Sequence, residues 1–257
     1  MKASLFWISS ALLLACMSGL GKSEIQCLPE ATGPAGTALR EIQAELQACA
    51  LCAPAYFTSM TARPPDLCID DSALAPRGAY EPEAHRIVLS LHLSRGEQLL
   101  VALHEIRHLD QVALGLCPSP QMAQEAYVTA KLALEADAMA NTVGLAWSMR
   151  HTNTGTWRAA QSISQYDDIT RIFSDRIDEG ATMPEAVGSA FAQWYKSGWR
   201  VENYRLAACM SQLDQRDAQH LLPLYAPLPE AFFEVLCKLP DGRPYPCEVP
   251  DQTPESD

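Results

Sequence analysis

The sequence predicts a mainly helical α+β protein with a small β-sheet or a single edge strand, stapled by disulfides. Three observations predict this class: several long segments with apolar residues at helical spacing, one segment with strand alternation, and an abundance of cysteines. The chain has 257 residues, of which 48% are hydrophobic, so it can bury a substantial core. No linker or internal repeat divides the chain, and we expect a single domain over 22–257.

The N-terminus has the composition of a signal peptide, which we assign to residues 1–21. Lys2 precedes an apolar run over 5–15 that is too short to span a bilayer. Two processing sites are open: LLAC matches a lipobox ending at Cys16, and GLG at 19–21 suits an ordinary signal peptidase. We therefore expect a secreted, periplasmic or cell-envelope protein, with membrane attachment only through a lipidated Cys16.

The charge balance narrows the range of partners. The chain carries 31 acidic and 19 basic residues, a net charge of −12. Such a balance argues against nucleic acid or an anionic membrane surface as the main partner, because both require basic patches.

The cysteine count agrees with export. Nine cysteines are present, and loss or lipidation of Cys16 leaves eight, which indicates up to four disulfides with open connectivity. Cys237 and Cys247 flank a Pro- and Gly-rich loop, and we expect them to pair. Cys49 and Cys52 have C-x-x-C spacing, but no second such pair and no preceding strand is present, so structural disulfides are favoured over a zinc or redox site.

The strongest local signals lie in the middle of the chain. Apolar and polar residues alternate over 86–93, which predicts a strand. Ser94 and Glu97 then form a capping box, and the helix that begins there should end at Gly115. Residues 53–84 contain five prolines and are expected to be irregular. Further helices are expected from Thr37 to about 51, over 121–149, and at roughly 157–178, 184–197 and 200–215.

The predicted helix after the strand contains the motif HEIRH. Four residues advance a helix by about 400°, so His104 and His108 lie on one face and can bind one Zn²⁺. Glu105 is offset from the metal and suits a general base. A chance H-E-x-x-H in a chain of this length is a roughly one-in-a-hundred event. The apolar residues around the motif predict burial, and buried polar side chains need partners.

A catalytic zinc site requires a third protein ligand. The extension H-E-x-x-H-x-x-G-x-x-H is absent, because Gln111 and Leu114 occupy its last two defined positions. A carboxylate on the next helix is therefore expected, and we choose Glu135 over Glu125 and Asp137. The alanines around Glu135 would allow its helix to approach closely, whereas Glu125 lies near the turn.

The motif HEIRH together with EADA at 135–138 resembles the gluzincin pattern of two histidines and a downstream glutamate. More narrowly, the chain resembles an uncharacterised family of bacterial metallopeptidases whose motif has the form H-E-x-R-H. The resemblance implies a zincin-like core with an active-site helix and a glutamate-bearing helix, a zinc cofactor, and hydrolysis of protein or peptide substrates. The sequence departs from many gluzincins at Met139, where they carry an aspartate that orients a histidine.

The mechanism that the resemblance implies uses a zinc-bound water activated by Glu105. A further donor would stabilise the oxyanion, and Tyr204 is our candidate, with His220 and Tyr195 as alternatives. The strand over 86–93 would offer an edge to an extended peptide. Two other functions stay open: a non-catalytic zincin-fold envelope lipoprotein acting as a binding or structural module, and a zinc hydrolase of non-peptide amides.

Overall fold

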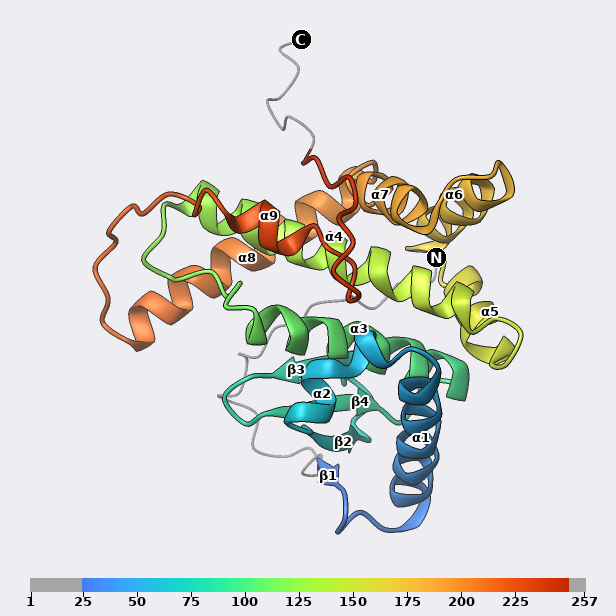
Figure 1. The fold of residues 1–257 in the computed structure, drawn as a ribbon. Helices are drawn as coiled ribbons and strands as arrows, with labels where there is room; N and C mark the ends of the chain where they lie inside the picture. Colours follow the sequence, from blue (N-terminus) through green and yellow to red (C-terminus); the bar gives the residue numbers. More distant parts are fainter. Residues whose placement is uncertain (1–24, 250–257) are drawn as a thin grey trace, which may run out of the picture. The chain divides into compact units, whose positions relative to one another are not determined.

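The computed structural model describes residues 25–249 and forms two compact units. The first unit extends to Cys117 and also includes Leu145–Ser162, and the second comprises Pro118–Gly144 and the chain from Ile163 onward. The expected class, mainly helical with a small sheet, is confirmed (Figure 1). The expected signal peptide, including the lipobox at Cys16, lies outside the described residues.

The first unit contains a mixed four-stranded sheet. Its strands are β1 (Gln26–Cys27), β2 (Asp66–Asp70), β3 (Gly78–Glu81) and β4 (Arg86–Ser90), in the order β1-β2-β4-β3. The inner strands β2 and β4 are parallel, and each outer strand is antiparallel to its neighbour. The strand predicted over 86–93 therefore ends at Ser90 and is an inner strand, while β3 forms the edge on that side.

Residues 53–84 are more regular than the prolines suggested. They form a short 3₁₀ helix, η1 (Pro54–Phe57), the helix α2 (Thr58–Ala62), and both β2 and β3. The expectation of an irregular segment was wrong because β2 is covered on both faces. Leu67, Cys68 and Ile69 are all buried, so the strand shows no alternation of apolar and polar residues.

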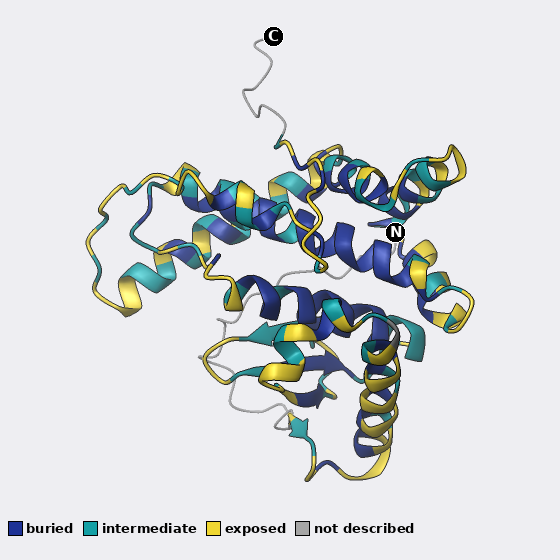
Figure 2. Ribbon diagram, viewed as in Figure 1, coloured by how far each residue is buried: buried dark blue, intermediate teal, exposed yellow. Residues whose placement is uncertain are grey.

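Helices α1 (Gly33–Cys52) and α3 (Arg95–Ala113) pack against this sheet, and α5 (Thr154–Ser162) packs against α3. Helix α1 begins before the predicted Thr37, and Figure 2 shows that it buries one face and exposes the other. Its buried face joins one core with the sheet and α3. Core residues include Leu39, Ile42, Leu46, Ile69, Ile87, Leu89, Leu99, Leu103 and Ile106.

Helix α3 begins and ends where its capping signals predict. Ser94 and Glu97 form both hydrogen bonds of a capping box, and Gly115 follows the helix with a φ of 75°. The helix lies directly against the edge strand β3. A Cβ atom at Gly78 would come within 2.3 Å of a methyl group of Val101, so only glycine permits this approach.

The second unit is helical. It contains most of α4 (Gln124–Ser148), whose last turn belongs to the first unit, and α6 (Asp167–Asp178), α7 (Met183–Trp194), α8 (Gly198–Ala218) and α9 (Phe232–Leu236). The helix predicted over 157–178 is two helices, α5 and α6, because a turn intervenes in which the side chains of Ile163 and Tyr166 are buried. Among the described residues, no helix combines the length and hydropathy needed to cross a bilayer.

Two disulfides are present in the described chain. Cys237–Cys247 closes the C-terminal loop as predicted, and Cys27–Cys68 joins β1 to β2 at directly paired positions. Disulfides persist in oxidising compartments, so they indicate an exported protein.

A buried guanidinium ties three helices of the second unit together. Arg200 on α8 binds both carboxylate oxygens of Asp168 on α6, at 2.8 and 2.7 Å. It also donates to the backbone carbonyls of Trp194 and Gln193 near the end of α7. Burial tends to raise the pKa of Asp168, but the hydrogen bonds from Arg200 and Gln193 outweigh it and hold that pKa below its usual value.

We predict that Asp168→Asn lowers the free energy of unfolding by about 3 kcal/mol, because it leaves the Arg200 charge buried without its counterion. Urea denaturation at neutral pH measures this. Since the folded-state pKa of Asp168 is depressed, its contribution is complete above the unfolded value of ~3.9 and is lost as the pH falls through the folded value. The exposed pair Arg176–Glu179 provides the control, and Glu179→Gln should change stability little. Equal effects of the two substitutions would contradict this account.

Candidate metal centre

The motif HEIRH lies on α3 at its most buried stretch. His104 is 4% exposed and Glu105 is 2% exposed, and neighbouring Leu103 and Ile106 are fully buried. The helix can be buried here because β3 and α1 cover it within the first unit. Polar side chains in such a setting lose water and must find other partners.

The two histidines face one another. Their Nε2 atoms are 3.1 Å apart, and their ring planes are nearly perpendicular. Two nitrogens that bind a tetrahedral zinc at ~2.0–2.1 Å lie about 3.3 Å apart, so the observed spacing is close to that of a shared ion. The helical spacing seen in the sequence thus brings the two ring nitrogens together.

Gln111 selects the tautomer of one imidazole. Its Oε1 lies 2.8 Å from Nδ1 of His108, and an amide oxygen can only accept. Nδ1 therefore carries a proton, and in the neutral imidazole the lone pair lies on Nε2, the atom that faces His104. Partners of this kind orient metal-binding histidines and raise their basicity. Gln111 is 2% exposed, so water does not compete strongly for this bond.

Glu105 is held by the backbone of the edge strand. Its Oε2 accepts a hydrogen bond of 2.8 Å from the amide of Tyr80 on β3. The Tyr80 amide points outward from the sheet, because Tyr80 lies between the residues that bond to β4. The close approach at Gly78 brings α3 near enough for this contact. One oxygen of the carboxylate, Oε2, is therefore held by the strand.

Tyr80 is in turn anchored through His85. The Tyr80 hydroxyl lies 3.0 Å from His85 Nδ1, and His85 Nε2 lies 3.1 Å from the carbonyl oxygen of Arg63. Because the carbonyl accepts, Nε2 carries the proton and Nδ1 accepts from the tyrosine. Burial raises the pKa of Tyr80, while the charge of Arg63 lowers it in part. His85 thus holds the side chain of Tyr80, whose backbone amide binds Glu105.

The predicted third ligand, Glu135, lies on α4 at one of its few accessible positions. Within residues 130–146, every side chain is buried except those of Lys131 and Glu135. Among the described residues, one group of three could hold a metal ion: His104, His108 and Glu135, whose ligand atoms lie within 4.8 Å of one another. Two imidazoles and a carboxylate form a donor set of catalytic zinc sites, with a fourth position for water or substrate.

The two rival carboxylates have other partners. Glu125 is 77% exposed and forms an ion pair of 2.9 Å with Arg205 on α8. Asp137 is fully buried and accepts hydrogen bonds from Tyr245 and Asn141. Neither belongs to the His-His-Glu group, although the choice of Glu135 as a ligand stays a prediction.

The predicted oxyanion donor, Tyr204, lies on α8 among aromatic side chains. Its hydroxyl is 3.0 Å from that of Tyr166, and its ring packs edge-on against Trp194. The alternative Tyr195 is 8% exposed, burial raises its pKa, and its hydroxyl has no hydrogen-bond partner among the described residues. His220 is exposed at the end of α8. The assignment of an oxyanion donor therefore stays a prediction.

Two contacts of this site were not predicted from the sequence. Gln111 could have been found, because it lies three residues after His108 on the same helical face. Tyr80 could not, since it contributes a backbone amide from a strand that the sequence did not reveal.

Comparison with known proteins identifies the family to which the chain belongs. A family model described as "Putative metallopeptidase family (DUF6782)" matches residues 22–247. This match covers most of the chain, and the chain belongs to this family. A search of curated proteins found no match, and neither did a search of solved structures.

We predict that Gln111→Met lowers zinc affinity about 10–100-fold, because His108 loses the acceptor that fixes its tautomer. Competition with a chromophoric chelator measures the affinity. Gln98 provides a matched control, since it is also a buried glutamine on α3 but donates to the carbonyl oxygen of Ser90. Gln98→Met should retain the wild-type affinity, and a similar loss in both variants would contradict a specific role for Gln111.

Proposed function

We propose that the protein is a zinc-dependent metallopeptidase that hydrolyses peptide bonds in the cell envelope or outside the cell. His104, His108 and Glu135 would hold the metal. One observation carries the proposal, namely that the ligand atoms of these three residues lie within 4.8 Å of one another. Membership of a metallopeptidase family supports it independently.

The donor set favours zinc over harder cations. Mg²⁺ and Ca²⁺ prefer oxygen ligands, whereas two of the three donors here are imidazole nitrogens. When bound, zinc supplies a Lewis acid that polarises a carbonyl group and lowers the pKa of coordinated water toward ~7.

Glu105 is the proposed general base. The hydrogen bond from the Tyr80 amide to Oε2 restricts rotation of the carboxylate, so Oε1 accepts the proton of the attacking water. The same oxygen then returns the proton to the leaving amine. Glu105 is adjacent to His104 in α3, which places the base within one helical turn of both histidines.

The proposed substrate is an extended peptide that pairs with the edge strand β3. The expectation that residues 86–93 offer an edge to an extended peptide is wrong, because β4 is paired with a strand on both sides. The Tyr80 amide donates to Glu105, so a peptide along β3 would pair through other backbone groups of the strand and would run beside the general base. Tyr204 remains the proposed oxyanion donor, with Tyr195 and His220 as alternatives.

The proposed location is the periplasm or cell envelope, or the external medium. The two disulfides support export. Lipidation of Cys16 would be the route of membrane attachment.

We predict that Glu135→Ala no longer retains zinc after dialysis, whereas the wild-type protein retains about one ion per chain. Removal of one of three ligands leaves the two histidines of α3, which hold the ion too weakly to survive dialysis. Elemental analysis measures the metal content. Glu125→Ala is the control and should keep zinc, because that carboxylate pairs with Arg205 at the surface. Retention of zinc in Glu135→Ala, or an equal loss in both variants, would overturn the ligand assignment.

We predict that Glu105→Gln keeps its zinc and loses hydrolysis by about 10²–10⁴-fold, since an amide cannot accept the proton of water. Release of fluorescence from labelled casein and from a mixed library of quenched peptides measures the rate. Glu125→Gln should retain the wild-type rate. An unchanged rate in Glu105→Gln would show that this carboxylate is not the base. A zinc-loaded wild-type protein with no cleavage of any probe would favour the binding-module alternative.

A further inference from the structure

The C-terminal disulfide closes a small hairpin, residues 237–247, which we call the cystine hairpin. Beyond the Cys237–Cys247 bond, the Tyr245 amide donates to the Cys237 carbonyl at 3.0 Å, and the Leu239 amide donates to the Arg243 carbonyl at 2.8 Å. The hairpin is therefore a closed unit with a defined register. It belongs to the same compact unit as residues 124–144 of α4.

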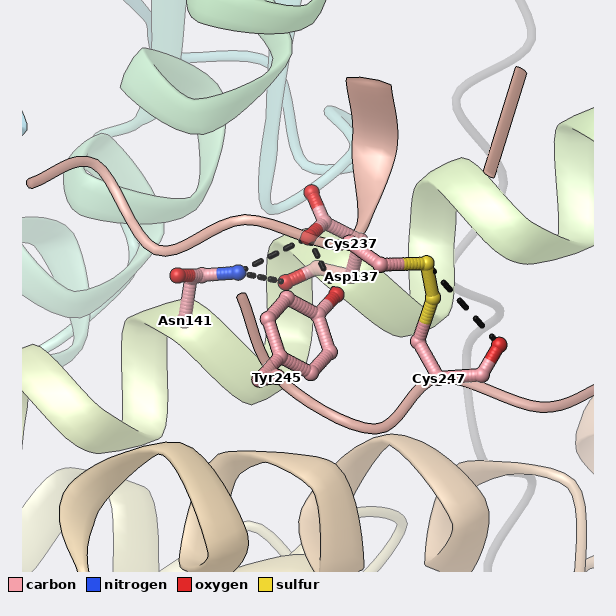
Figure 3. The surroundings of a disulfide bond; sticks show 5 residues. All are labelled: Asp137, Asn141, Cys237, Tyr245 and Cys247. Carbon is pink, nitrogen blue, oxygen red and sulfur yellow. Dashed lines mark hydrogen bonds between the residues drawn. A yellow bond between two sulfur atoms is a disulfide. The ribbon is translucent and has the colours of Figure 1, made fainter. Parts of the chain in front are cut away.

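One side chain of the cystine hairpin binds α4. The Tyr245 hydroxyl donates to Oδ1 of Asp137 at 2.5 Å, and Nδ2 of Asn141 donates to the same oxygen at 2.8 Å (Figure 3). Tyr245 is 4% exposed and Asp137 is fully buried. A buried carboxylate is stable only with such donors, so this contact is expensive to break.

The cystine hairpin is fixed on its other side by α7. A Cβ atom at Gly188 would lie 2.6 Å from the carbonyl oxygen of Pro246, so the hairpin backbone packs directly on the glycine. The rings of Phe191 and Tyr245 are also in edge contact. Tyr245 therefore approaches α4 from a rigid support.

The contact of Tyr245 with Asp137 lies on the face of α4 that is opposite to the predicted metal ligand, Glu135. Asp137 and Asn141 lie roughly 200° and 240° around the helix axis from Glu135. Glu135, in contrast, is one of the two accessible positions between residues 130 and 146. A polar anchor on the buried face therefore sets the rotation of the helix about its axis, and with it the direction of the Glu135 side chain.

We propose that Tyr245 is a positioning residue for the metal ligand Glu135, acting through Asp137 from the cystine hairpin. This inference rests on the proposed function, in which Glu135 binds zinc. In this arrangement the hairpin stabilises the rotational setting of α4 at which the carboxylate can complete the ligand set.

The test compares Tyr245→Phe with the wild-type full-length protein. We expect zinc affinity, measured by chelator competition, to fall about tenfold, within the range for residues that orient metal ligands. The visible spectrum of the Co²⁺-substituted protein should change, because the carboxylate no longer holds its position. In the metal-free protein, amide hydrogen exchange over residues 133–141 should be faster.

Tyr127→Phe is the matched control. Tyr127 is also buried and in α4, and its hydroxyl accepts a hydrogen bond of 3.2 Å from Gln215. This variant should lose stability while keeping the zinc affinity and the Co²⁺ spectrum of the wild type. A second test variant, Cys237→Ser/Cys247→Ser, frees the hairpin while keeping Tyr245, and should weaken zinc binding in the same way. It replaces Tyr245→Phe as the test if that variant does not fold.

The outcomes separate the two proposals. A wild-type protein that binds no zinc would overturn the proposed function, and the positioning role with it. A wild-type protein that binds zinc, together with a Tyr245→Phe variant of equal affinity and unchanged spectrum, would overturn the positioning role alone. Equal losses of affinity in Tyr245→Phe and Tyr127→Phe would also overturn it, since the effect would then be one of general stability.

Discussion

The placement of three polar side chains in the middle of the largely buried helix α3 is the constraint on which the candidate site depends. His104 and Glu105 lose almost all contact with water in the middle of α3, and His108, one turn later, is half-buried. Each uncompensated polar group of this kind costs about 1–3 kcal/mol. A small protein retains such a cluster only if its partners are built into the fold. The surroundings of α3 supply several of them.

Two of these partners come from neighbouring parts of the first unit. The Tyr80 amide satisfies one oxygen of Glu105, and Gln111 satisfies Nδ1 of His108. Each interaction binds one atom of its side chain, and the proposed function uses the other atoms, Oε1 of the glutamate and Nε2 of the histidine, which faces His104. In the proposed function these two atoms bind a cation and accept a proton, and the glycine at position 78 allows the contact with Glu105 by bringing α3 against β3.

Features of the fold and site that depend on neighbouring residues could be predicted from the sequence, whereas those that depend on distant residues could not. The capping box at Ser94, the stop at Gly115 and the Cys237–Cys247 pair are local, and the sequence predicted each correctly. The spacing of His104 and His108 is also local, since four residues define one helical face. Strand β2 was missed because burial on both faces erases the alternation that identifies strands. The anchor between Tyr245 and Asp137 joins residues 108 positions apart, and no local pattern reports such a contact.

The most direct test of the account is X-ray absorption spectroscopy at the zinc edge of the zinc-loaded protein. The account predicts one zinc per chain with nitrogen and oxygen neighbours at ~2.0–2.2 Å and multiple scattering from two imidazole rings. Sulfur neighbours at ~2.3 Å would instead place the ion at cysteines such as those of the C-x-x-C pair. That result, or the absence of imidazole scattering, would contradict a metal centre on α3.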